Sequence, residues 1–223
     1  QTFFKPQLWA GELVLASGEE GPPVKLQPGQ KVLSYATRGM EPLRGFPEFL
    51  RAAAVAQHAD PQLQVVVAGQ DRVVYSYRPN HPSGSWKQAL LEELAGQLDL
   101  KRLHFTGLVN YGDLKQLFCR SDLHCMFSRP YVISWGLFQA AACGARLLVN
   151  DDPGLSDVFA RPHERPAVNL EDQRAVNDAV LAGLAEPRLK ALPEPNLRPE
   201  YNLQYCKQQW LALLESCRPA AIS

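Results

Sequence analysis

Two arginines flank a loop that joins a short apolar segment to an amphipathic one. Arg38 and Arg44 stand at this loop, and each is followed by a glycine, Gly39 and Gly45. Paired guanidinium groups beside the free N–H groups of a helix start suit a phosphate, and glycine lets backbone approach a ligand closely. The pattern favours a phosphate-binding loop; the alternative is that both arginines are solvated surface residues.

A second candidate site is the stretch ISWGLFQAAACG at residues 133–144. Ser134 is expected to cap a helix that begins near Trp135, so that the N–H groups of Gly136 and Leu137 face an anion. The alternative is a buried helix that needs only a cap and small residues to pack against a sheet.

Metal chemistry has weak support in the sequence. Asp151 and Asp152 end an apolar segment and offer hard oxygen ligands, but adjacent acids alone are a weak signal. The five histidines have no ligand spacing, and the cysteines never form a CxxC pair. We therefore expect no metal and no cofactor.

Composition narrows the partners and the compartment. The 223 residues include 23 basic and 23 acidic side chains, and this balance gives no reason to expect a nucleic-acid partner. Five cysteines, an odd number within apolar or helical patterns, favour a reduced cytosolic compartment over a disulfide framework. No apolar run reaches the roughly 18 residues that span a membrane, and the first residues lack the pattern of a signal peptide.

Apolar strands and amphipathic helices alternate along the chain, which predicts an α/β fold with a doubly wound, parallel, Rossmann-like sheet. The carboxyl ends of such strands share one edge, where ligands bind. The expected strands are 31–37, 63–69, 102–107, 122–128 and 145–150, and the expected helices are 45–59, 85–98, 111–121, 135–144, 170–186 and 201–216.

Three regions follow from this pattern. Residues 1–30 are interpreted as an interdomain connector, 31–185 as the Rossmann-like domain, and 186–223 as a connector with a last amphipathic helix. Because the sequence lacks an initiator methionine and begins abruptly, we interpret it as part of a longer protein.

Blocks of the sequence resemble a known family. SYATRGMEPLRGFPEFLRAA, VVVAGQDR, HFTGLVNYGDLKQLFCRSDLHCMFS and ISWGLFQAAACG are similar, in order, to the carboxy-terminal, donor-binding half of GT-B glycosyltransferases of family 4. They are most similar to a bacterial subgroup with a TRGMEP-RGFP loop. The resemblance covers roughly residues 31–160 and implies a nucleotide-sugar-binding, Rossmann-like domain.

The resemblance also implies roles for residues. It puts Arg38 and Arg44 on the donor diphosphate, where they would stabilise the leaving group, and Gln139 on the ribose. Tyr131 and Ser134 would lie on the sugar side. The remaining expected contacts to donor are Gly39, Gly69, Gly107, Val109, Trp135, Gly136 and Leu137.

Two positions depart from the family. Gln139 stands where a glutamate normally accepts hydrogen bonds from the ribose, and Tyr131 stands where many members place a glutamate against the sugar. A neutral amide forms a weaker hydrogen bond than a carboxylate, so we expect donor binding to be roughly tenfold weaker. The losses leave a degenerate, non-catalytic interaction domain as an alternative. An epimerase of similar architecture is a third alternative, but it usually needs catalytic acids and a histidine in the cleft, and none is well placed here.

The implied activity is transfer of a hexose, with retention, from a nucleotide diphosphate sugar to a glycan or glycoconjugate, as in polysaccharide biosynthesis. The family's acceptor-binding amino-terminal half is missing here, so this chain alone is expected to be inactive. The full protein is expected in the cytoplasm, with peripheral association at the inner membrane face left open.

Overall fold

The computed structural model describes residues 3–8, 11–16, 23–129, 133–161, 167–188 and 193–217. At its centre is a parallel six-stranded sheet in the order β5-β4-β3-β6-β7-β8. Its strands are β3 (Val32–Gly39), β4 (Gln64–Gln70), β5 (Leu103–Gly107), β6 (Leu123–Met126), β7 (Leu147–Asn150) and β8 (Ala167–Val168). Along the chain, β4 and β5 are added on one side of β3, and β6, β7 and β8 are then added on its other side. This reversal confirms the doubly wound fold.

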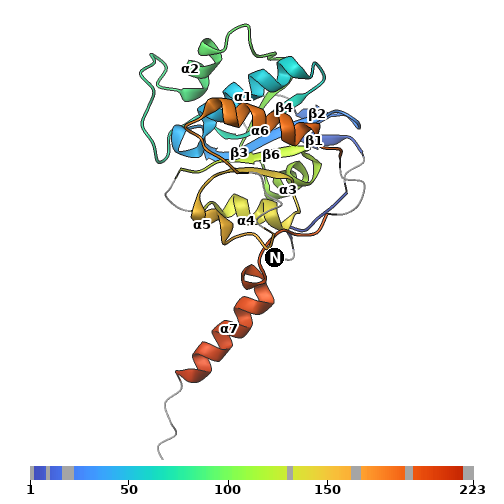
Figure 1. The fold of residues 1–223 in the computed structure, drawn as a ribbon, viewed down its shortest axis with the longest axis vertical. Coiled ribbons are helices and arrows are strands. Elements are labelled where there is room, and N and C mark those ends of the chain that lie inside the picture. Colours follow the sequence, from blue (N-terminus) through green and yellow to red (C-terminus); the bar gives the residue numbers. More distant parts are fainter. Residues whose placement is uncertain are drawn as a thin grey trace, which may run out of the picture.

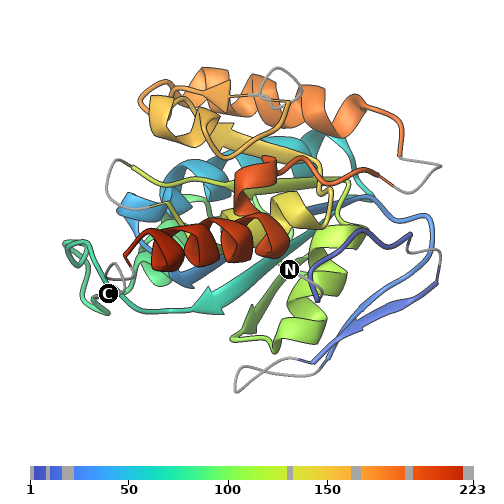
Figure 2. The same cartoon turned by 90° about the horizontal axis from the view of Figure 1, so that it is seen from below.

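Helices cover both faces of this sheet (Figures 1 and 2). The helices are α1 (Phe46–Ala59), α2 (Trp86–Glu93), α3 (Tyr111–Arg120), α4 (Trp135–Ala142), α5 (Pro153–Ser156), α6 (Gln173–Ala185) and α7 (Leu203–Ser216), with short 3₁₀ turns η1 (Pro42–Arg44) and η3 (Pro199–Tyr201). Helices α1, α2 and α6 share one core, and α3, α4 and α5 share another.

The strands explain why two cores form. In β4, Val65 and Val67 enter the core under α1, while Val66 and Ala68 point to the opposite face. Successive side chains of a strand alternate between faces, so an uninterrupted apolar run is buried on both sides. None of these four side chains is more than 3% exposed.

A glycine determines how closely the start of α1 approaches the sheet. Gly45 caps this helix with φ of 63°, in the left-handed region. A Cβ added there would lie 2.5 Å from Cβ of Phe127, just beyond β6. Only glycine combines this conformation with so close a contact, so Gly45 fixes where the loop after β3 meets the end of β6.

Residues before the main sheet form a small sheet of their own. The strands β1 (Leu13–Leu15) and β2 (Val24–Leu26) pair antiparallel. Leu13, Leu15 and Leu26 are fully buried in a cluster with Val66 and Leu117. This part of the predicted connector therefore packs on the domain and completes its core.

One predicted helix is clearly shorter in the structure, and one strand has no counterpart in the prediction. The helix expected over 85–98 is regular only from Trp86 to Glu93, because Leu94 leaves helical geometry and Gly96 adopts a φ of 78°. The sixth strand, β8, was not expected, since two residues are too few for a detectable periodicity.

The last helix stands apart from the sheet. None of the residues of α7 is buried, and Trp210 is 64% exposed. Figure 1 shows α7 extending away from the domain, while the turn before it contacts α4 through Tyr201 and Phe138, whose ring centroids are 4.9 Å apart. Among the described residues, no helix is both long and apolar enough to cross a bilayer.

Candidate functional site

A pocket of about 180 Å³ opens where the strand order reverses between β3 and β6. This is the position at which open parallel sheets bind ligands, because neighbouring loops diverge there to opposite faces. The pocket is lined by Ala36, Thr37, Arg38, Ala68, Gly69, Leu108, Val109, Leu114, Phe118, Met126, Ser134, Gly136 and Gln139. Five separate segments of the chain thus meet in one cavity.

The structure separates the predicted site residues into two groups. Those that line the pocket are Arg38, Gly69, Val109, Ser134, Gly136 and Gln139. Those that do not line it are Gly39, Arg44, Gly107, Trp135 and Leu137. Tyr131 lies outside the described residues. The predicted ligand edge is therefore one continuous region, but its residues do not all enter one cavity.

Two of the predicted glycines have a packing role. A Cβ on Gly69 would lie 2.3 Å from the carbonyl oxygen of Thr37, and one on Gly39 would lie 2.6 Å from that of Arg72. Both distances are far below a van der Waals contact, and the register of β3 against β4 shifts between Ala36 and Gly39. These glycines are required by the backbone itself, whether or not a ligand is present.

The start of α4 is capped as its sequence predicts. The Ser134 side chain accepts a hydrogen bond of 3.3 Å from the N–H of Gly136, and its carbonyl accepts one of 3.0 Å from that of Leu137. Both N–H groups are therefore engaged within the cap. The longer bond is weak by ordinary geometry, so the Gly136 N–H is the one that a ligand can most easily take over. The Trp135 side chain is 82% exposed and points away from the core.

The two arginines have different surroundings. Arg38 is exposed and makes no hydrogen bond or ion pair with another described residue. Arg44 donates from Nη1 to Ser128 Oγ at 2.7 Å, and its guanidinium lies 5.2 Å from the ring centroid of Tyr75. The Arg44 carbonyl accepts a 2.7 Å hydrogen bond from the Tyr35 hydroxyl, whose pKa is raised well above its usual value by burial. Arg44 is thus held in place, whereas Arg38 is free to move toward a ligand.

A buried carboxylate supports the loop after β4. Glu41 is fully buried, and its Oε2 accepts hydrogen bonds of 2.9 Å from the N–H groups of Val74, Tyr75 and Ser76. Sequence reasoning did not single out this residue. Its only signal is an acid within the loop between a buried strand and a helix, where a carboxylate can accept several backbone hydrogen bonds.

Acidic side chains are absent from the lining of the pocket within the described part of the chain. The Gln139 side chain has no hydrogen-bond partner among the described residues, so its amide is available to a ligand. Asp152, one of the paired acids, caps α5 by accepting a 2.9 Å hydrogen bond from the Gly154 N–H. The described ranges contain no cluster of metal-ligating side chains.

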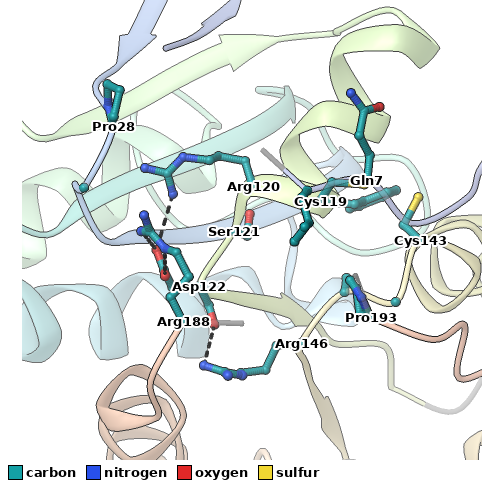
Figure 3. A pocket seen from close by; sticks show the side chains of 15 residues that line it. Gln7, Pro28, Cys119, Arg120, Ser121, Asp122, Cys143, Arg146, Arg188 and Pro193 are labelled. Carbon is teal, nitrogen blue, oxygen red and sulfur yellow. Dashed lines mark hydrogen bonds and ion pairs between the residues drawn. The ribbon is translucent and has the colours of Figure 1, made fainter. Parts of the chain in front are cut away.

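A larger cavity, of about 350 Å³, lies at the opposite edge of the sheet (Figure 3). Asp122 accepts from the Val32 N–H at 2.8 Å and is 2.6 Å from Nη2 of Arg188, while Arg120 donates to the Gln30 carbonyl at 2.7 Å. These guanidinium groups are therefore used to join chain segments before β3 and β6. Because ligands of such sheets bind at the other edge, we assign this cluster a structural role.

Two thiols in the same cavity perturb each other. A hydrogen bond from Cys143 lowers the pKa of Cys119 to about 7, with smaller contributions from a backbone hydrogen bond of Gln7 and from the charge of Lys115. The same contact and burial raise the pKa of Cys143. All five cysteines are free thiols.

The family model described as "Glycosyl transferases group 1" matches residues 19–194. No curated protein sequence matches the chain. A similar solved structure is the carboxy-terminal domain of a glycosyl transferase group 1 family protein, LpcC, from Francisella tularensis. It is 15% identical with a TM-score of 0.57, and the match covers 71% of this chain and 77% of that one.

Two longer proteins are also similar in structure. Sucrose-phosphate synthase from Thermosynechococcus elongatus is 16% identical with a TM-score of 0.59, over 84% of this chain and 46% of that one. HepE from Anabaena, in complex with UDP and glucose, is 17% identical with a TM-score of 0.58, over 84% of this chain and 48% of that one. This chain therefore spans about half the length of each.

Proposed function

Because the chain belongs to the group 1 glycosyl transferases, we propose that it is the donor-binding domain of a retaining GT-B enzyme of family 4, within the TRGMEP-RGFP subgroup. The reaction transfers a hexose from a nucleotide diphosphate sugar to a glycan or glycoconjugate. The observation that carries the proposal is the pocket at the reversal of strand order, which combines Arg38, the start of α4 and the unpartnered amide of Gln139.

The diphosphate is assigned to the arginines. Arg38 lines the pocket without a competing partner, and the hydrogen bond to Ser128 holds the Arg44 guanidinium beside the same sheet edge. Negative charge grows on the diphosphate as the sugar departs, so prepositioned cations stabilise the transition state more than the ground state. The N–H of Gly136 adds a neutral donor when Ser134 releases it.

The nucleoside is assigned to the apolar side of the pocket. Leu108 and Val109 follow β5 and line the pocket together with Gln139; we assign the first two to the base and Gln139 to the ribose. An amide offers one acceptor oxygen and two N–H donors, but no negative charge. We therefore expect the Gln139 amide to form a weaker hydrogen bond with the ribose than a carboxylate would. Tyr131 remains a prediction for the sugar side.

The acceptor is assigned to a part of the enzyme outside this chain, because the chain spans 46% and 48% of the two longer similar structures. Group 1 membership supports the sugar donor. We place the reaction in the cytoplasm, in keeping with the free thiols.

The test is calorimetric titration with UDP, GDP, ADP and TDP. We expect one nucleotide to bind and Arg38→Ala to weaken that binding by about tenfold or more. Arg174→Ala is the matched control, because this side chain is 92% exposed on α6 and does not line the pocket.

The second candidate is a non-catalytic interaction domain, favoured by the lack of acidic side chains among the described residues that line the pocket. A folded sample that binds none of the four nucleotides supports this candidate and rejects the donor site. Binding that Arg38→Ala and Arg174→Ala leave equally unchanged rejects the assignment of the diphosphate to Arg38.

A further inference from the structure

A groove of about 620 Å³ runs between the loop after β4 and the start of α1. It shares no lining residue with the nucleotide pocket. One wall is aromatic and comes from the loop and α2. The other is polar and comes from α1 and the segments after β6 and β8.

The aromatic wall is formed by Tyr75, Tyr77 and Trp86. Trp86 donates from Nε1 to the Tyr77 carbonyl at 2.8 Å, and the two rings meet at 72° with centroids 5.7 Å apart. Tyr77 nevertheless stays 68% exposed. The backbone beneath Tyr75 is held by the Glu41 carboxylate. Large rings are thus presented to solvent on a loop that is already ordered.

The polar wall has no net charge. Arg129 lies 2.9 Å from Glu48 and 3.0 Å from Glu171, and Arg51 pairs with Glu93 at 2.6 Å. Two arginines and two glutamates line the groove, so their formal charges cancel. An anionic ligand such as a phosphate or a nucleic acid finds no excess of cations here.

Two polar atoms of the lining lack partners. Glu48 Oε2 and Ser76 Oγ are buried without a hydrogen bond to any described residue. Glu48 is only 9% exposed, and a buried polar group without a partner is costly. A carboxylate oxygen requires a donor, while a serine hydroxyl takes either role. A ligand hydroxyl group can donate to the carboxylate and can take either role toward the serine.

We propose that this groove binds a neutral oligosaccharide. A pyranose ring has a flat C–H face that packs on exposed aromatic rings and an edge of hydroxyls that both donate and accept. The groove provides a complementary surface for each, and its charges cancel. This second saccharide site goes beyond the proposed donor site. It can be tested separately from the donor site, because the two cavities share no lining residue.

The test is saturation-transfer NMR of the full chain with four neutral hexasaccharides, namely maltohexaose, cellohexaose, chitohexaose and mannohexaose. We expect transfer to at least one, and binding that is weakened about tenfold by Trp86→Ala and by Tyr77→Ala. Tyr77→Ala guards against misfolding of the Trp86 variant, because Tyr77 is 68% exposed. Trp210→Ala on α7 is the matched control and should bind as the unaltered chain does.

Nucleotide titration of the same variants distinguishes the two sites. Tyr77→Ala and Trp210→Ala should bind a nucleotide equally well, while Arg38→Ala should keep its saccharide signal. Three results overturn the proposal: no transfer to any of the four hexasaccharides, full binding by Tyr77→Ala, or binding of hexagalacturonate as tight as that of the best neutral hexasaccharide.

Discussion

Arg44 and Ser128 are joined by a hydrogen bond of 2.7 Å from Nη1 to Oγ. The bond connects the loop after β3 with the end of β6, across the point where the strand order reverses. Ser128 is itself positioned by a 2.8 Å hydrogen bond from its N–H to the side chain of Asn150, the last residue of β7. The carboxyl ends of three neighbouring strands thus hold one guanidinium in place.

This relationship predicts a graded loss of nucleotide binding. Arg44→Ala removes a positive charge and should weaken nucleotide binding by about tenfold. Ser128→Ala keeps that charge but removes the hydrogen bond that positions the Arg44 guanidinium, so its effect on binding should be smaller. Calorimetry with the best-binding nucleotide measures both. A Ser128→Ala effect that equals or exceeds that of Arg44→Ala would argue that the serine contacts the ligand directly.

The Glu41 carboxylate should be a major source of stability for the loop after β4. Glu41→Ala leaves the backbone donors of Val74, Tyr75 and Ser76 without their acceptor, which should lower the free energy of unfolding by about 3 kcal/mol. Glu41→Gln retains an acceptor oxygen and should cost less. Urea denaturation measures the difference, with the exposed Glu215→Ala on α7 as control. Equal stability of Glu41→Ala and the control would refute this role.

Buried His124 should make the protein sensitive to acid. Burial lowers the pKa of His124 to about 3, with its Nδ1 2.6 Å from Ser34 Oγ. Below the usual histidine pKa, the unfolded chain binds a proton that the folded chain excludes. Stability due to this group is therefore constant above about pH 6.5 and falls as the pH decreases toward 3, by at most about 1.4 kcal/mol per unit.

The variant His124→Asn should show a shallower dependence of unfolding free energy on pH across this window. The slope is compared rather than the absolute stability, because the substitution also changes packing against Phe118, whose ring centroid is 4.8 Å from that of His124. Identical slopes in the two proteins would exclude His124 as the origin of the acid sensitivity.

The half-buried thiol of Cys119 should react near neutral pH. Its pKa is lowered to about 7 by the hydrogen bond from Cys143, so its rate of alkylation by iodoacetamide should rise with a midpoint near pH 7. Burial raises the pKa of Cys125, and that thiol should stay unreactive in the folded state. Mass spectrometry of the labelled peptides measures both.

The variant Cys143→Ala removes the hydrogen bond and should move the Cys119 midpoint to higher pH. An unchanged midpoint in this variant would show that the backbone hydrogen bond of Gln7 and the charge of Lys115, rather than Cys143, lower the pKa of Cys119.

Much of the architecture was predictable from local patterns. Uninterrupted runs such as VVVA at 65–68 can be buried on two faces only in a covered parallel sheet, and the sheet confirms that prediction. The capping of α4 by Ser134 follows equally from residue type. By contrast, β8 is only two residues long and pairs with β7, so its existence depends on a neighbouring strand that no local window contains.

The two arginines show how far the candidate site could be predicted from the sequence. Their spacing in the loop indicates a cationic edge, and residue type alone determines that both can bind a phosphate. Which one enters the cavity depends on the end of β6, since Ser128 holds Arg44 there while Arg38 lines the pocket. Hydrogen bonds to residues 84 positions away leave no periodic signal in the sequence.

By itself, the sequence determined the strand and helix alternation and the kinds of side chain at the carboxyl ends of the strands, because these depend on periodicity and residue chemistry. Only the tertiary structure decided that Glu41 is buried under the loop after β4, that Cys119 contacts Cys143, and that aromatic and charge-balanced walls face each other across a groove. Those features depend on contacts between segments that are distant along the chain and meet only when the sheet has formed.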